Sequence, residues 1–281
     1  MSDVVKKPKV IFFGNGPLAE YALAVISQEC QVIFHARTRE DLAKVCELKR
    51  EHLEAHGVLA SFGVMIKPAV LDLFEPEGIL NIHPSLLPLY RGASPIESAI
   101  LAGDDEFSVS VMKLVKAMDA GPIYYQATFG TEEIKKIASA ATEVADDNFP
   151  SKAEIYQVLA EAGAKWICEH LNDLPKPIEQ DETRATFCGK LDKSMGALTP
   201  ETDTADLVLR KIVAYQGFPK PKYAFYDVPC IVLEAHICKP SETAVLTIPC
   251  ADGAAVAVDR LQPEGRKAMD VKSFLNGYAK K

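Results

Sequence analysis

The sequence predicts an α/β protein whose first part is a doubly wound, mostly parallel, Rossmann-like sheet. Two observations support this: short apolar runs alternate with amphipathic segments, and glycine turns or polar loops separate them. A third observation divides the chain, because a stretch rich in prolines and charges interrupts the alternation before further short apolar runs follow. We expect a first domain at 1–175, a linker at 176–202 and a small β domain at 203–281.

Each element of the first domain follows from its own pattern. Apolar runs with β-branched and aromatic residues predict strands at 9–16, 30–36, 58–65, 78–83, 107–115 and 121–129. Apolar positions at helical spacing predict helices at 17–28, 40–57, 95–103 and 151–173. Because strands and helices alternate, the ligand should bind beyond the carboxyl ends of the strands.

The second domain should be mostly β. The segment ADLVLRKIVAYQ at 205–216 reads as a helix, and apolar runs at 230–237, 243–250 and 254–261 read as strands separated by turns. The proline-rich stretch before them is expected to run over the surface.

Composition limits the function classes. Seven cysteines without a C-x-x-C pair indicate neither a disulfide framework nor a metal site, so no metal is expected. The start of the chain lacks the pattern of a signal peptide, and no apolar run is long enough to cross a bilayer, so a cytoplasmic protein without membrane contact is expected. The net charge of −8 belongs to residues 1–175, with 16 basic against 25 acidic residues, whereas 203–281 has 11 against 9.

The glycines after the first strand suggest a dinucleotide site only weakly. Gly14 and Gly16 match part of the G-x-G-x-x-G fingerprint, and Ala19 could replace its third glycine. No acidic residue ends the second strand to hold a ribose. A tight turn between strand and helix is therefore the better interpretation.

A stronger constellation lies in NIHPSLLPLYRGASPIE, at the end of the fourth predicted strand. Asn81 and His83 stand two residues apart, and Asp119 lies in a turn that a neighbouring strand pair could bring close. An Asp can orient a His, and an Asn can donate to an oxygen that gains charge. These are parts for acyl transfer to an amine, although a structural His83 is an equal alternative on spacing alone.

The same stretch, NIHPSLLPLYRGASPIESAI, resembles the signature of the folate-dependent formyltransferases. The resemblance implies catalytic roles for Asn81, His83 and Asp119, and 10-formyltetrahydrofolate as the formyl donor. It also implies a folate pocket formed by Phe62, Gly63, Val64, Ser85, Leu86, Leu87, Pro88, Gly121 and Ile123.

Two further stretches, QDETRATFCGKLDK and LQPEGRKAMDVKSFLNG, resemble the branch of this family that formylates initiator methionyl-tRNA in translation initiation. That branch implies an OB-like β barrel as the second domain and a monomeric enzyme. The substrate side would include Gly14, Arg37, Arg91, Gly92 and Lys190, with Arg39, Lys44, Arg184 and Lys193 as further cations. Arg91 could meet a phosphate or the terminal adenosine of the tRNA, and a structural role for it is an equal alternative.

Two departures keep other acceptors open. The long basic loop usual after the second strand is largely missing here, and MDAGPI differs from the usual L-D-T-G-D form. The alternatives are a formyltransferase for a small amine, such as a nucleotide-linked amino sugar or glycinamide ribonucleotide, and a binding protein that has lost catalysis.

Overall fold

The computed structural model describes residues 7–139, 149–239 and 245–279. The chain divides into two compact units. The first comprises Met1–Ile96 and Asp105–Gly189, and the second comprises Glu97–Asp104 and Lys190–Lys281. The boundaries drawn from the sequence at 175 and 202 stay a prediction.

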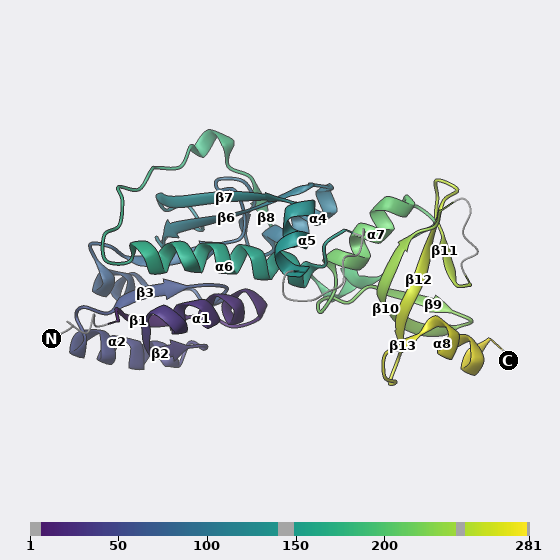
Figure 1. The fold of residues 1–281 in the computed structure, drawn as a ribbon, viewed down its shortest axis with the longest axis horizontal. Coiled ribbons are helices and arrows are strands. Elements are labelled where there is room, and N and C mark those ends of the chain that lie inside the picture. The colour runs from purple at the N-terminus through teal and green to yellow at the C-terminus, as the bar shows by residue number, and fades with distance from the viewer. Residues whose placement is uncertain (1–6, 140–148, 240–244, 280–281) are drawn as a thin grey trace. The chain divides into compact units, whose positions relative to one another are not determined.

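The first unit is built on a six-stranded sheet in the order β2-β1-β3-β4-β6-β7 (Figure 1). Its strands are β1 Lys9–Phe13, β2 Gln31–Ala36, β3 His56–Leu59, β4 Ile79–His83, β6 Glu106–Lys113 and β7 Ile123–Gly130. The first four are parallel, whereas β6 and β7 run antiparallel to their neighbours. The doubly wound α/β class is thereby confirmed.

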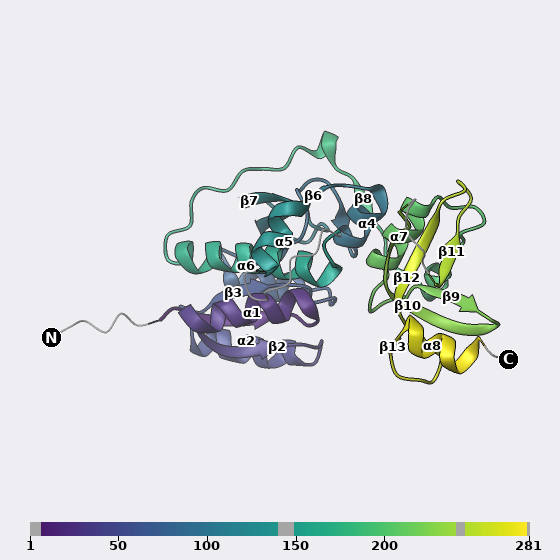
Figure 2. The same cartoon turned by 45° about the vertical axis from the view of Figure 1, so that its right-hand side comes forward.

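Helices cover both faces of this sheet. On one face lie α1 (Pro17–Glu29) and α6 (Lys152–His170), side by side in both ribbon views (Figures 1 and 2). Gly163 lets α6 approach closely, because a Cβ there would lie 2.9 Å from a side-chain carbon of Ile82. The other face carries α2 (Asp41–Glu51), α3 (Pro68–Leu71) and the 3-10 turn η1 (Asp72–Phe74), which share an apolar cluster with β1.

Two elements of the first unit differ from the sequence prediction. The helix expected at 40–57 ends at Glu51, and β3 begins at His56. Gly57 belongs in the sheet because a Cβ there would lie within 2.9 Å of Ile79 and Phe74, a space that only a glycine fits. The amphipathic helix α5 (Thr131–Ser139) was not foreseen.

The proline-rich stretch has more structure than a linker needs. It contains the 3-10 turn η2 (Glu182–Arg184) and the short strand β8 (Phe187–Cys188), which pairs in parallel with β5 (Arg91–Gly92). The helix α4 (Pro95–Ala102) follows β5. Residues near 180–188 are therefore fastened beside the loop that follows β4.

The second unit is a curled antiparallel sheet in the order β11-β12-β10-β9, with β13 paired to β12. Its elements are η3 Lys193–Gly196, α7 Ala205–Ala214, β9 Lys222–Phe225, β10 Val228–Ile237, β11 Thr247–Pro249, β12 Ala255–Pro263, β13 Met269–Asp270 and α8 Val271–Tyr278. The predicted strand at 243–250 begins with two residues outside the described ranges; β9 and α8 were not predicted. This curled sheet, half of a barrel, matches the OB-like class.

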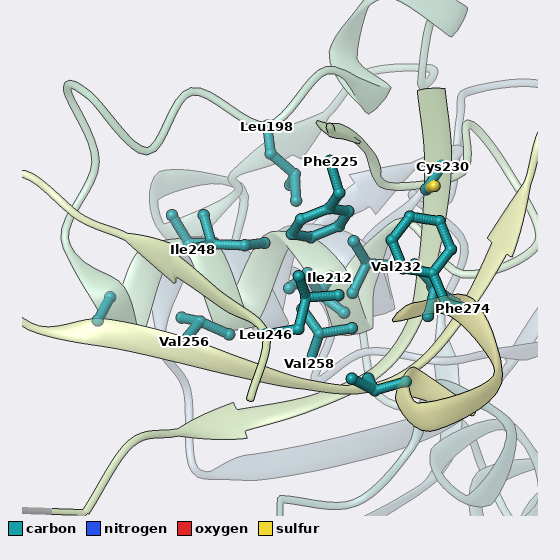
Figure 3. Close-up of a cluster of buried hydrophobic side chains, with 14 residues drawn as sticks. Leu198, Ile212, Phe225, Cys230, Val232, Leu246, Ile248, Val256, Val258 and Phe274 are labelled. Atoms are coloured by element: carbon teal, nitrogen blue, oxygen red, sulfur yellow. The ribbon is translucent and has the colours of Figure 1, made fainter. Parts of the chain in front are cut away.

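The core cluster that the second unit forms between Leu198 and Phe274 is apolar. Phe274 of α8 is fully buried among side chains from α7 and the strands, including Ile212 and Phe225 (Figure 3).

Within residues 7–139, 149–239 and 245–279, no helix is both long and apolar enough to cross a bilayer.

Candidate active site

Asn81 and His83 lie at the carboxyl end of β4, in the middle of the sheet. They are two residues apart on one strand, so their side chains leave the same face. Both are buried, at 5% exposure each. Within the described part of the chain the amide of Asn81 has no hydrogen-bond partner, which leaves it available to a ligand.

The imidazole of His83 lies between two oxygen atoms. Its Nε2 is 3.2 Å from the carbonyl oxygen of Tyr90, and its Nδ1 is 3.8 Å from Oδ1 of Asp119. Both oxygens are hydrogen-bond acceptors, because one belongs to a carbonyl and the other to a carboxylate. The geometry therefore suits an imidazole that acts as a proton donor.

Asp119 reaches His83 by an indirect route. Because β6 is antiparallel to β4, Lys113 stands opposite Leu80 and Ser110 stands opposite His83. The connection from β6 to β7 thus leaves the sheet away from His83 and must fold back toward it. Asp119 adopts a positive φ of 48° in this connection, a conformation that Asp tolerates better than most residues.

The second carboxylate oxygen of Asp119 is held by the backbone. The N–H of Gly92 donates to Oδ2 of Asp119 over 2.8 Å. Gly92 has a φ of 125°, and a Cβ there would lie 2.2 Å from the carbonyl oxygen of Cys188. A glycine is needed at this position because β8 approaches so closely.

The loop after β4 is fixed by the buried hydroxyl of Ser110 and the amide of Gln126, which the sequence prediction did not include. Ser110, with 0% exposure, donates to the carbonyl of Ser85 over 2.7 Å and accepts from the N–H of Leu87 over 3.1 Å. Gln126 donates to Ser110 Oγ and to the carbonyl of Leu87, each over 2.9 Å. These side chains belong to β6 and β7, and only the sheet pairing brings them to the loop.

The residues predicted to bind folate divide into two groups. Phe62, Ser85, Leu87, Pro88 and Gly121 are buried or already bonded; Phe62 packs in the core, and the hydroxyl of Ser85 donates to the carbonyl of Leu89 over 2.7 Å. The remaining four, Gly63, Val64, Leu86 and Ile123, are at least partly exposed. The predicted folate contacts stay a prediction, with side-chain contact favoured for Val64, Leu86 and Ile123.

Arg91 was predicted on the substrate side, with a structural role as an equal alternative. It is buried at 2% exposure, and its Nη1 and Nη2 donate to both carboxylate oxygens of Glu182 over 2.8 and 2.6 Å. These hydrogen bonds from Arg91 to Glu182 raise the pKa of Arg91 and lower the pKa of Glu182. A guanidinium committed in this way favours the structural alternative.

The other predicted substrate residues lie in different settings. Gly14 fits the turn interpretation, since a Cβ there would lie 2.1 Å from the carbonyl oxygen of Ala60. Arg37 is exposed just after the carboxyl end of β2, and its side-chain Nε donates to Nδ1 of His35 over 3.3 Å. Lys190 is exposed, as are Arg39, Lys44, Arg184 and Lys193. Their contact with substrate stays a prediction.

Gln180 was not singled out from the sequence, although it lies in the stretch QDETRATF that carries part of the resemblance. Its side chain bonds to Arg91 and to the backbone of the Asp119 connection. Among the described residues there is no cluster of three or more His, Cys, Asp or Glu side chains that could hold a metal ion.

Comparison with known families gives two matches. Residues 7–150 match the family described as formyl transferase, and residues 190–279 match the formyl transferase C-terminal domain. The chain is 33% identical over 257 residues to the methionyl-tRNA formyltransferase of Gluconobacter oxydans (strain 621H). That alignment covers 86% of this chain and 76% of the relative.

Solved structures share the fold at low sequence identity. HypX from Aquifex aeolicus in complex with tetrahydrofolic acid superposes with a TM-score of 0.68 at 18% identity, covering 98% of this chain and 48% of HypX. The methionyl-tRNA formyltransferase from Clostridium thermocellum gives 0.64 at 14%, covering 91% and 97%. The sugar 3N-formyl transferase WlaRD gives 0.61 at 14%, covering 92% and 98%. These structural likenesses show the fold alone.

Proposed function

The chain belongs to the formyl transferase family, and from that premise we propose that it transfers the formyl group of 10-formyltetrahydrofolate to the amino group of initiator methionyl-tRNA. The single observation that supports this most strongly is the 33% identity to a methionyl-tRNA formyltransferase over 86% of the chain. The fold does not determine which amine accepts the formyl group, because a sugar 3N-formyl transferase has the same fold.

We assign the chemistry to Asn81, His83 and Asp119. The free amine of the methionyl group attacks the formyl carbon, and the new C–N bond moves an electron pair onto the formyl oxygen. The amide of Asn81 donates to that oxygen, which gains charge in the transition state. The Nε2–H of His83 donates to it as well, in place of the carbonyl of Tyr90, which lies 3.2 Å away in the free enzyme.

Asp119 keeps His83 oriented and accepts the proton that the amine releases, through a water molecule. When the bond from the formyl carbon to N10 breaks, the electron pair stays on N10, which takes up a proton and leaves as tetrahydrofolate. Donor, acceptor and protons therefore balance without a metal or a covalent enzyme intermediate.

We assign folate binding to the segment 62–64, the loop 85–88 and the positions Gly121 and Ile123. The tRNA is assigned to exposed cations, mainly Arg37 and Lys190, and to the domain at 203–281. With few such cations, tRNA binding should be weakly salt-dependent for a tRNA enzyme. This activity implies a cytoplasmic enzyme, and we propose that it works as a monomer.

An acceptor competition tests the proposal. The protein is incubated with labelled 10-formyltetrahydrofolate and, in separate reactions, methionyl-tRNA, an amino-sugar nucleotide or glycinamide ribonucleotide. We expect label on methionyl-tRNA. Label on a small amine alone would refute the tRNA assignment while leaving formyl transfer in place, and absence of label on every acceptor would refute catalysis itself.

A further inference from the structure

One side chain from a distant segment holds the connection that carries Asp119. The amide nitrogen of Gln180 donates to the carbonyl oxygen of Asp119 over 2.8 Å and to that of Gly121 over 2.7 Å. Its Oε1 accepts from Nη2 and Nε of Arg91 over 2.7 and 3.1 Å. A glutamine has two amide hydrogens and two acceptor sites on its oxygen, so Gln180 uses its full hydrogen-bonding capacity.

We propose that Gln180 is a positioning residue for formyl transfer: it fixes the β6–β7 connection so that the carboxylate of Asp119 faces His83. The inference rests on the catalytic role proposed above for Asp119. The stretch near residue 180, which the sequence predicted to be a surface linker, would then help to position a catalytic residue.

The connection needs such a clamp because its own backbone does not direct it toward His83. It leaves the sheet beside Leu80 and folds back, with Asp119 in a left-handed conformation. Gly121 lies against the backbone, since a Cβ there would be 1.8 Å from the carbonyl oxygen of Lys113. Gln180 binds the two carbonyls on either side of Ala120, and so fixes the orientation of the peptide units next to Asp119.

The same glutamine is connected to the other side of the carboxylate. Arg91, which donates to Gln180, directly precedes Gly92, whose N–H donates to Oδ2 of Asp119. Arg91 is in turn fixed by the carboxylate of Glu182. The backbone and the carboxylate of Asp119 are therefore held by one connected network of hydrogen bonds.

Loss of the clamp should affect turnover more than binding. The separation of 3.8 Å between Asp119 and His83 is already longer than a hydrogen bond, so a further shift weakens their interaction steeply. A misplacement of about 1 Å in a catalytic group costs up to roughly 100-fold in rate. The tRNA surface assigned above does not include Gln180, so tRNA affinity should be preserved. Folate affinity is not a test of the inference, because Gln180 also binds the carbonyl of Gly121, which is assigned to the folate pocket.

Gln180→Met tests this, because it keeps the length of the side chain and removes its hydrogen bonds. We expect kcat at saturating folate to fall roughly 10- to 100-fold with an unchanged KM for methionyl-tRNA. Gln180→Glu is a second variant: it keeps the acceptors for Arg91, loses the donors to both carbonyls, and should show a similar loss. Gln157→Met is the matched control, since Gln157 of α6 donates to Glu161 over 2.9 Å and lies outside the residues assigned to catalysis, folate and tRNA. Its kcat should be that of the wild type.

A double-mutant cycle with Asp119→Asn separates positioning from a general structural effect. If Gln180 acts through Asp119, adding Gln180→Met to Asp119→Asn lowers kcat little further. Losses that multiply, or a wild-type kcat for Gln180→Met and Gln180→Glu, would overturn the inference while leaving the proposed function intact. A wild-type kcat for Asp119→Asn alone would instead remove Asp119 from the mechanism, and the inference with it.

Discussion

The two compact units differ in what they bury. The first contains buried polar side chains in and around its sheet: Lys49, Asn81, His83, Ser85, Arg91, Ser94, Ser108 and Ser110. In the second unit, the described residues contribute one buried polar side chain, Glu97 of α4, and those between Lys190 and Lys281 contribute none and form an apolar core. Buried polar groups need partners and are costly without them, so the first unit retains them where they serve a site.

This difference separates two kinds of sensitivity. In the first unit, substitution of a buried polar residue should remove activity and leave much of the stability, because the sheet itself is held by apolar packing. In the second unit, substitution of a core residue should remove stability and leave the chemistry untouched.

The largest expected effect comes from His83→Ala. It removes the imidazole that donates to the formyl oxygen, and general acid catalysis contributes about 10²- to 10⁴-fold, so kcat should fall by that factor. Folate binding, measured by titration of the free enzyme, should change little because other segments carry it.

The matched control is His170→Ala. His170 is a partly exposed histidine of α6 that binds the carbonyl of Trp166 over 2.9 Å and stacks on the Trp166 ring. Its substitution should leave kcat unchanged. If His83→Ala abolished folate binding in a folded protein, His83 would belong to the pocket and not to the chemistry.

The next effect concerns the second unit. Phe274→Ala removes a fully buried ring that packs against Phe225 at 6.2 Å and stacks on Tyr278 at 4.8 Å between centroids. Such truncations cost about 3–5 kcal/mol, which denaturant unfolding would show as a lower midpoint. Val245→Ala, at a side chain that is 75% exposed, should change the midpoint very little. A loss of kcat without a loss of stability would contradict the assignment of a packing role to this core.

Much of the first unit could be predicted from the sequence because its signals are local. The apolar strand β4 ends at Asn81 and His83, and alternation alone places their side chains on one face. The helix α6 has a regular apolar pattern and a capping box between Ser151 and Glu154, so both the helix and the residue at which it begins could be predicted.

The remaining features depend on contacts between distant segments. Gln180 meets Asp119 across 61 residues, and Arg91 meets Glu182 across 91 residues, so no local pattern could reveal either pair. Arg91 illustrates the consequence: a cation beside a loop glycine resembled a phosphate contact, and only the fold shows its carboxylate partner. The helix α8 was missed for a different reason, since it is short and its apolar face is satisfied only by the sheet of the second unit.

A smaller effect should appear in tRNA binding. Arg37 is exposed just after the carboxyl end of β2, and His83 stands at the carboxyl end of β4. Because both strands belong to the parallel part of the sheet, the two residues lie at the same end of it. One phosphate contact adds about 0.7–0.9 to the slope of log affinity against log salt, so Arg37→Ala should reduce the slope by that amount. Arg50→Ala is the control, since Arg50 is exposed but lies at the opposite end of α2. Equal slopes for both variants would exclude Arg37 from the tRNA surface.

The smallest expected effect is a pH dependence of stability at the Arg91–Glu182 pair, whose carboxylate side chain is 67% exposed and therefore screened by solvent. Hydrogen bonds from Arg91 lower the pKa of Glu182 in the folded protein, so the unfolded chain binds this proton more readily. The stabilisation is complete above the ordinary glutamate pKa of about 4.3 and is lost as the pH falls through the lowered value. Glu182→Gln should therefore have a lower Tm than the wild type at neutral pH, and the difference should shrink in acid.

Glu179→Gln, at an exposed neighbour of the same charge, should show no such pH-dependent difference. A Tm difference that stayed constant with pH would mean that the shape of the side chain at position 182, and not its charge, holds Arg91 beside the site.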